Sequence, residues 1–280
     1  MRFLSNAHTH STYCDGGNTL LEMIDAAQAL GFQSLGFSGH AWQGFDESYS
    51  MTKEGQAAYL REIRALQQAR EPGAPRLWAG LELDGMAMEA CRNATDGFDY
   101  VIGSTHYLTL DFHGAPVAVD GDAARLRLYV DEAFHGDGLA MTRRYYELET
   151  DALLRDRPAI IGHFDLVRKH AARVRLFDEA DPAYQRVAVN ALERAFASGA
   201  VLEVNTGGMA RGYLPTPYPM RELLCAWREM GGRVTVTSDC HDARYLDYAF
   251  EQALALIRGA DFQSIEILGK RDKLWETVEL

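Results

Sequence analysis

Short polar segments rich in histidine and carboxylate side chains recur along this sequence. His8 and His10 stand two residues apart in a segment of extended pattern, where alternate side chains project from the same face, so the pair could chelate one metal ion. A lone histidine is more often structural or exposed, and it is the recurrence that indicates a metal centre. The candidate ligands are His8, His10, Asp15, His40, Glu82, His106, His163, Asp239 and His241.

The chemistry open to such a ligand set is metal-assisted hydrolysis. Imidazoles combined with carboxylates suit Zn, Mn or Fe better than Ca or Mg, which favour shells made of oxygen alone. Nine ligands exceed what one tetrahedral or octahedral site can use, so we expect two to three divalent ions per chain. Water bound between two dications loses a proton near neutral pH and becomes a nucleophile.

The elements that must position these residues alternate between strands and helices. Apolar runs predict seven strands at residues 3–4, 34–37, 77–81, 100–102, 159–161, 201–204 and 234–237. Helical patterns cover residues 20–30, 55–70, 141–155, 183–196, 219–230 and 246–258. Such alternation predicts a parallel α/β sheet, either closed into a barrel or open. Each candidate ligand ends a strand or follows one, Asp15 at a short distance. Because the carboxyl ends of parallel strands lie at one edge of the sheet, we expect these residues to form a single site.

Composition limits the classes of protein to which the chain can belong. The 280 residues are 47% hydrophobic and 24% charged, which suits one globular domain over residues 1–280 without a membrane span. The N-terminus lacks the apolar stretch of a secretory signal, and the four cysteines show no paired spacing, so we expect a cytoplasmic protein with free thiols. A net charge of -12 disfavours nucleic acid as a partner, and an anionic substrate would need a local cationic site.

Seven segments taken together resemble the polymerase and histidinol phosphatase superfamily, and more closely its histidinol-phosphate phosphatase branch. They are NAHTHSTYCDG, LGFSGHAW, GLELDG, FDYVIGSTHYL, IIGHFDLVRKH, LEVNTGG and TSDCHDARYL. The resemblance implies a distorted (β/α)7 TIM-like barrel with a trinuclear metal centre. It also implies hydrolysis of a small phosphate monoester, with L-histidinol phosphate as the expected substrate.

The resemblance also implies how the ligands divide among three metal ions. The first ion would be held by His8, His10, Glu82 and Asp239, the second by Glu82, His106 and His163, and the third by Asp15, His40 and His241. Some members of the superfamily have histidine where this chain has Asp15, which leaves the identity of the third ion open.

Further roles follow from the same resemblance or from position. The resemblance places Arg168 and Arg211 on the phosphate, and a planar guanidinium suits bidentate phosphate recognition. Asp239 or His241 could protonate the leaving alkoxide. Asp84 and Asp165 could orient histidine ligands or cap strand ends. Cys14 and Cys240 flank presumed ligands and are expected to pack rather than react. The irregular residues 111–138 could form a lid or an insertion.

Three alternative functions remain open from sequence. Another phosphoesterase of the superfamily could act on nucleotides or short oligonucleotides, although no stripe of aromatic and basic residues supports binding of long strands. Metal amidohydrolases also begin with His-x-His on the first barrel strand, but here the late element is the Asp239-x-His241 pair. A non-catalytic metal-binding module is the third alternative, and the filled ligand set argues against it.

Overall fold

Seven parallel strands form the centre of the computed structural model, which describes residues 5–69 and 73–280. They follow one another in chain order around the sheet: β1 (Ser5–Asn6), β2 (Ser34–Phe37), β3 (Arg76–Asp84), β4 (Tyr100–Ser104), β7 (Ile160–Ile161), β8 (Val201–Asn205) and β9 (Val234–Thr237). Beyond β1 and β9, Thr9 pairs in parallel with Cys240. The first and last strands therefore meet at their carboxyl ends, and the sheet is a nearly closed barrel of one domain, as predicted.

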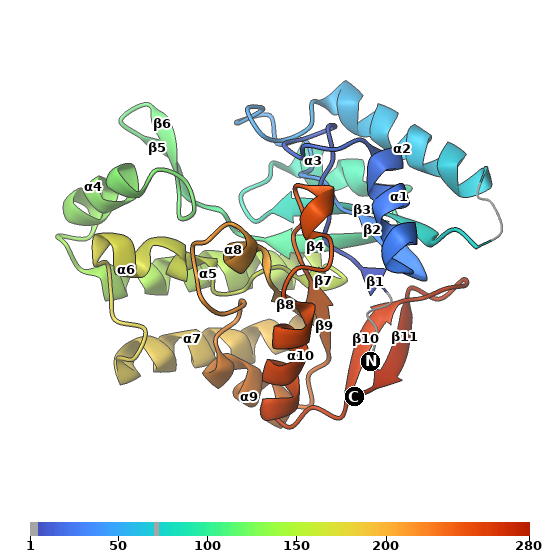
Figure 1. Ribbon diagram of the computed structural model, residues 1–280. Coiled ribbons are helices and arrows are strands. Elements are labelled where there is room, and N and C mark those ends of the chain that lie inside the picture. The colour runs from blue at the N-terminus through green and yellow to red at the C-terminus, as the bar shows by residue number, and fades with distance from the viewer. Residues whose placement is uncertain (1–4, 70–72) are drawn as a thin grey trace.

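Helices surround this barrel (Figure 1). They are α1 (Leu20–Leu30), α2 (Lys53–Gln68), α3 (Glu89–Arg92), α4 (Ala123–Ala133), α5 (Gly138–Asp156), α6 (Ala171–Val174), α7 (Pro182–Ala195), α8 (Gly207–Ala210), α9 (Arg221–Glu229) and α10 (Phe250–Gly259). A capping box of Thr19 and Glu22 opens α1, and the Asp181 side chain caps α7. The predicted strand at residues 3–4 and the predicted helix end at residue 70 lie outside the described residues.

Two antiparallel hairpins are absent from the sequence prediction. The first, β5 (Tyr107–Phe112) with β6 (Ala115–Ala118), is followed by α4, so the expectation that residues 111–138 are irregular is wrong. Its two-residue turn places His113 and Gly114 at positive φ, a conformation more often signalled by Asn-Gly, and the sequence pattern therefore hid it. In Figure 1 this hairpin projects from the barrel beside α4.

The second hairpin, β10 (Ser264–Leu268) with β11 (Trp275–Glu279), packs against the amino ends of the first strands. Ser34 donates a hydrogen bond to the Leu268 carbonyl at 2.6 Å, and the Trp78 indole donates one to Gly269 at 2.9 Å. Leu268 belongs to a small apolar cluster with Trp78, Tyr100, Ile102 and Ile160. This cluster forms an apolar floor at the end of the barrel opposite the candidate ligands.

Side chains of β3 alternate between two environments, as a strand requires. Leu77, Ala79 and Leu81 belong to the larger core cluster that the helices share, whereas Trp78 and Glu82 lie on the other face of the strand, toward the floor cluster and the polar end.

Within the described residues, no helix is long and apolar enough to cross a membrane.

Gly80 lies between Trp78 and Glu82 on the inner face of β3, where a Cβ would stand 2.3 Å from the Tyr100 ring. Because the ring is buried and its hydroxyl is bonded to the Ala7 carbonyl at 2.6 Å, it has little freedom to move. We expect Gly80→Ala to lower the free energy of unfolding by about 1–3 kcal/mol, measured by urea denaturation. Gly259→Ala, whose Cβ meets open space, is the matched control and should not destabilise the protein. Equal unfolding midpoints for the two variants would contradict the packing argument.

Candidate metal centre

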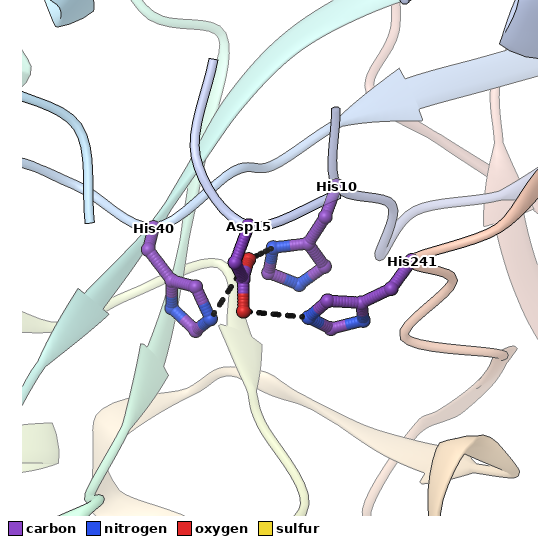
Figure 2. A group of neighbouring side chains, drawn as sticks. All are labelled: His10, Asp15, His40 and His241. Atoms are coloured by element: carbon purple, nitrogen blue, oxygen red, sulfur yellow. Dashed lines mark hydrogen bonds and ion pairs between the residues drawn. The ribbon is translucent and has the colours of Figure 1, made fainter. Parts of the chain in front are cut away.

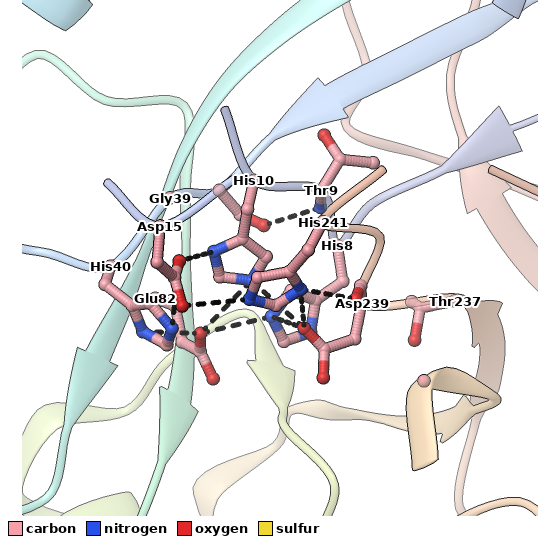
Figure 3. A network of polar contacts seen from close by, with 12 residues as sticks. His8, Thr9, His10, Asp15, Gly39, His40, Glu82, Thr237, Asp239 and His241 are labelled. Carbon is pink, nitrogen blue, oxygen red and sulfur yellow. Dashed lines mark hydrogen bonds and ion pairs between the residues drawn. The ribbon is translucent and has the colours of Figure 1, made fainter. Parts of the chain in front are cut away.

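All nine predicted ligand residues gather at the carboxyl end of the barrel. Figure 3 labels them, except for His106 and His163. His8 and His10 follow β1, Asp15 lies in the turn before α1, and His40 follows β2. Glu82 lies within β3, which extends to Asp84 and is thus longer than predicted. The remaining four, His106, His163, Asp239 and His241, follow β4, β7 and β9.

Glu82 is the common neighbour of most of these groups, and its side chain is only 1% exposed. Its Oε2 lies 3.2 Å from His8 Nε2 and 3.6 Å from His10 Nε2. Asp239 completes this first group, with Oδ1 at 3.1 Å from His10 Nε2 and 3.7 Å from His8 Nε2. Asp239 takes a left-handed φ of 48°, which is uncommon outside glycine.

The other carboxylate oxygen of Glu82 faces a second group. Its Oε1 lies 3.1 Å from His163 Nε2 and 3.5 Å from His106 Nε2. Asp84 accepts hydrogen bonds from the His106 backbone NH at 2.9 Å and contacts its Nδ1 at 3.1 Å. Burial alone would lower the pKa of His106, but the hydrogen bond to Asp84 and the charge of Glu82 raise it to about 10. Asp84 therefore orients His106, one of the two roles considered from sequence.

Asp15 is the centre of a third group (Figure 2). One carboxylate oxygen lies 3.6 Å from His10 Nδ1 and 3.8 Å from His40 Nε2, and the other lies 3.2 Å from His241 Nε2. His40 also reaches Glu82 through Nδ1 at 2.9 Å, so it stands between two groups. The three groups are thus contiguous and share Glu82, His10 and His40.

The fit of this cluster to metal ions follows from its unsatisfied atoms. Glu82 Oε2 and the ring nitrogens His8 Nε2, His10 Nε2 and His40 Nδ1 are buried and make no hydrogen bond among the described residues. Buried polar atoms without partners are costly, and all four point into the shared groups. Nitrogen and carboxylate donors at such spacing are a ligand set for divalent transition metals.

Burial and neighbouring charges keep two donors, Glu82 and His10, in the form that binds a metal. Burial acts against ionisation of Glu82 and is the largest cause, but His40 and His8 outweigh it and hold its pKa well below the usual range. Burial, followed by the nearby His241 and His40, lowers the pKa of His10 to about 3, so its imidazole is neutral. An ionised carboxylate beside a neutral imidazole is what metal ligation requires.

Glu203 is a supporting residue that the sequence analysis missed. It lies within β8, fully buried, and its Oε2 contacts His8 Nδ1 at 2.9 Å and accepts a hydrogen bond from Thr237 at 2.7 Å. Its Oε1 accepts from the His163 backbone at 2.6 Å and from Asn205 at 2.8 Å. The signal available in the sequence was a lone acid inside the apolar run 201–204. Glu203 fixes the ring of His8 so that Nε2 faces Glu82.

A pocket of about 440 Å³ opens onto this cluster. Arg211 lines it, donating to Asp239 Oδ2 at 2.8 Å and lying 3.0 Å from His241 Nδ1. Lys169 and Arg125 also line it, and sequence reasoning identified neither. One wall comes from β6 and the turn that follows it, which places the predicted insertion directly at the site.

Arg168 is not among the residues that line the pocket, and its contact with phosphate stays a prediction from the resemblance. Its guanidinium is 5% exposed and forms ion pairs with Asp165 at 3.0 Å and Glu179 at 2.7 Å. Asp165 also accepts from the Met220 backbone NH at 2.8 Å, so it holds Arg168 and the start of α9 rather than a histidine. Both residues connect loops around the barrel rim.

The two cysteines beside predicted ligands fit the expected packing role. Burial raises the pKa of the Cys14 thiol to about 11 and that of the Cys240 thiol to about 12. Both therefore remain protonated at neutral pH, which disfavours nucleophilic chemistry.

Glu203→Gln should weaken metal binding. All four contacts of the Glu203 carboxylate are with hydrogen-bond donors, so the amide NH2 of glutamine would face donors on one side and loosen either His8 or His163. We expect zinc affinity to fall about 10–100-fold, measured by competition with a chromogenic chelator. Glu251→Gln, on the exposed face of α10, is the control for loss of one charge. Unchanged affinity in folded Glu203→Gln protein would show that His8 is held by other contacts.

Comparison with known proteins agrees with this geometry. The PHP domain model matches residues 6–207. A probable histidinol-phosphatase of Deinococcus radiodurans is 30% identical over 268 residues, covering 92% of this chain and 94% of that protein. The histidinol-phosphatase of Bacillus subtilis is 24% identical over 272 residues, covering 89% and 97% of the two chains.

Solved structures share the fold at lower sequence identity. Histidinol phosphate phosphatase of Lactococcus lactis, complexed with Zn, L-histidinol and phosphate, has a TM-score of 0.68 at 21% identity and covers 95% of this chain and 97% of its own. A structure from Listeria monocytogenes has a TM-score of 0.72 at 18% identity and covers 89% and 99%. The family match over most of the residues, together with the relative at 30% identity, shows that this chain belongs to the PHP domain family.

Proposed function

We propose that the protein is a metal-dependent phosphatase that hydrolyses L-histidinol phosphate to L-histidinol and phosphate. The observation that carries the proposal is the convergence of nine candidate metal ligands, Glu82 among them, at a pocket of small-molecule size. The names of the curated relatives and the histidinol and phosphate bound in the Lactococcus lactis structure support the choice of substrate. A cytoplasmic location stays a prediction from sequence.

The observed groups support the ligand sets expected for up to three divalent ions, Zn, Mn or Fe. The first set is His8, His10, Glu82 and Asp239, the second is Glu82, His106 and His163, and the third is Asp15, His40 and His241. Bound ions supply Lewis acidity, which lowers the pKa of water and neutralises phosphoryl oxygens. Glu82 presents one carboxylate oxygen to each of the first two sets, so it would hold their ions side by side.

The protein's own groups then position the phosphate ester. Arg211 lines the pocket between Asp239 and His241, where a guanidinium can donate two parallel hydrogen bonds to a phosphate. It supplies the local cation that a chain of net charge -12 needs for an anionic substrate.

Protonation of the leaving alkoxide remains a prediction for Asp239 or His241. The side chain of His241 is 26% exposed and that of Asp239 is 8% exposed, so His241 is the better placed to reach an ester oxygen in the pocket. Burial, the largest single cause, raises the pKa of Asp239. The charges of Arg211 and His8 together outweigh it and hold this pKa well below the usual range.

The function is tested by assaying metal-analysed protein on histidinol phosphate, nucleotides and sugar phosphates. We expect two to three ions per chain and a preference for histidinol phosphate.

His106→Ala removes a donor of the second set and should lower kcat by orders of magnitude with the fold kept. The control His113→Asn changes an exposed histidine to a residue that tolerates its positive φ. At most one bound ion, or near-normal turnover in His106→Ala, would overturn the proposed centre.

Arg211→Ala should cut kcat/KM by about ten- to a hundredfold on every phosphate monoester, because it loses a charge-assisted contact to the phosphate itself. Arg211→Lys keeps the charge but not the planar geometry, and an intermediate loss is expected. Arg244, whose side chain is 78% exposed, provides the control substitution Arg244→Ala. Steady-state kinetics on histidinol phosphate and an aryl phosphate give the comparison. If Arg211→Ala matches wild type on both, metal ions alone hold the phosphate.

A further inference from the structure

The segment that follows β6 forms a pocket wall fixed directly beside the metal centre. The Val119 NH donates to the carbonyl of His106 at 2.7 Å, and Tyr107 pairs with Ala118 in the β5–β6 hairpin. Next along the chain, Asp120 lines the pocket together with His106 and His163. Its backbone carbonyl and that of Gly121 contact the His170 ring, at 3.3 and 2.9 Å. The wall is therefore anchored on both sides of Asp120.

Three carboxylates outside the metal groups line this pocket, and two of them already have structural partners. Asp122 caps α4 by accepting from Ala124 and Arg125 backbone NH groups at 2.7 and 3.2 Å. Asp46 accepts from the Tyr107 hydroxyl at 2.8 Å and from Ser48. Asp120 is different, because among the described residues its carboxylate contacts a single cation, Lys169 Nζ at 3.3 Å, and its side chain is 28% exposed.

The two cationic side chains near Asp120, Arg125 and Lys169, already have contacts within the protein. Arg125 donates to the backbone carbonyls of Phe112, Ala115 and Pro116. Lys169 lies over the Tyr213 ring, 4.4 Å from its centroid, while it contacts Asp120. One oxygen of Asp120 can thus remain with Lys169 while the other receives a second cation.

The geometry of the substrate requires a carboxylate close to the phosphate site. In histidinol phosphate the ammonium group is on the second carbon from the ester oxygen, so it stays near the metal centre when the phosphate is bound there. Burial of an unpaired ammonium is costly, so its pocket needs an ionised partner. Asp120, on the wall joined to the His106 backbone, is the carboxylate in that position.

We propose that Asp120 binds the ammonium group of the substrate and thereby selects amino-alcohol phosphates over other phosphate monoesters. The inference rests on the proposed function and adds a specificity residue to it. Lys169 holds the carboxylate in place, and Tyr49 and Tyr107, which also line the pocket, flank the space left for the imidazole end of the substrate.

The test compares two substrates that differ only in the ammonium, L-histidinol phosphate and its desamino analogue 3-(imidazol-4-yl)propyl phosphate. On metal-loaded protein, Asp120→Asn should lower kcat/KM for histidinol phosphate about ten- to a hundredfold, mainly through KM, and change that for the analogue less than about twofold. Asp120→Glu, which keeps the charge, should retain most of the discrimination.

Asp122→Asn is the matched control, since it removes one negative charge from the same wall while asparagine can still cap α4. It should leave the preference of the enzyme unchanged. Equal losses of kcat/KM on both substrates in Asp120→Asn would overturn the inference and show that Asp120 only holds Lys169. A loss confined to histidinol phosphate in Asp122→Asn would also overturn it, because discrimination would then come from the overall negative potential of the wall. Wild-type protein that hydrolyses both substrates equally well overturns this inference alone, and protein that hydrolyses neither overturns the proposed function with it.

Discussion

The buried carboxylate of Glu82 is the constraint on which the rest of this structure depends. An ionised group that is 1% exposed is stable only if positive or hydrogen-bonding partners surround it, and here the partners are imidazoles delivered by four different strands. Those imidazoles can meet at one point only if the strands end at the same edge of a closed sheet. The pairing of Thr9 with Cys240 supplies that closure next to His8 and His10. The barrel and the metal cluster therefore depend on each other.

The two ends of the barrel interior contribute differently, one to the stability of the fold and the other to the metal centre. The apolar floor around Tyr100 and Leu268 supplies hydrophobic burial, which stabilises the fold without polar compensation. The polar end carries groups whose burial is costly, and two of its histidines are oriented by a second carboxylate, His8 by Glu203 and His106 by Asp84. The C-terminal hairpin closes the floor, so a change there would act on the fold while leaving the ligands in place.

Sequence reasoning was most accurate where local pattern and topology agree. The positions of six strands and the convergence of the ligand residues followed from periodicity and from the rule that parallel strands share a carboxyl edge. It failed where the outcome depends on contacts between distant residues. The ion pairs of Arg168 with Asp165 and Glu179, for example, have no signal in the local sequence pattern. Glu203 was missed because one acid in an apolar strand has no periodic signal, and the β5–β6 hairpin because its His113-Gly114 turn is not a common one.

The division between barrel and insertion also separates chemistry from selectivity. Glu82 lies within β3 and pairs on both sides, with His40 and with Ile102, and the other ligands follow barrel strands. Their positions are therefore set by the fold and suit any phosphate ester. The wall built from residues 115–125 lies outside the barrel sheet and is fixed to it by the hydrogen bond from Val119 to His106 and by the buried Val117 and Val119. Its pocket-lining side chains, such as Asp120, can vary without disturbing the sheet. A substrate whose distinguishing group lies two carbons from the phosphate must be read by that wall. The metal centre thus accounts for hydrolysis, and the identity of the substrate depends on the insertion that borders it.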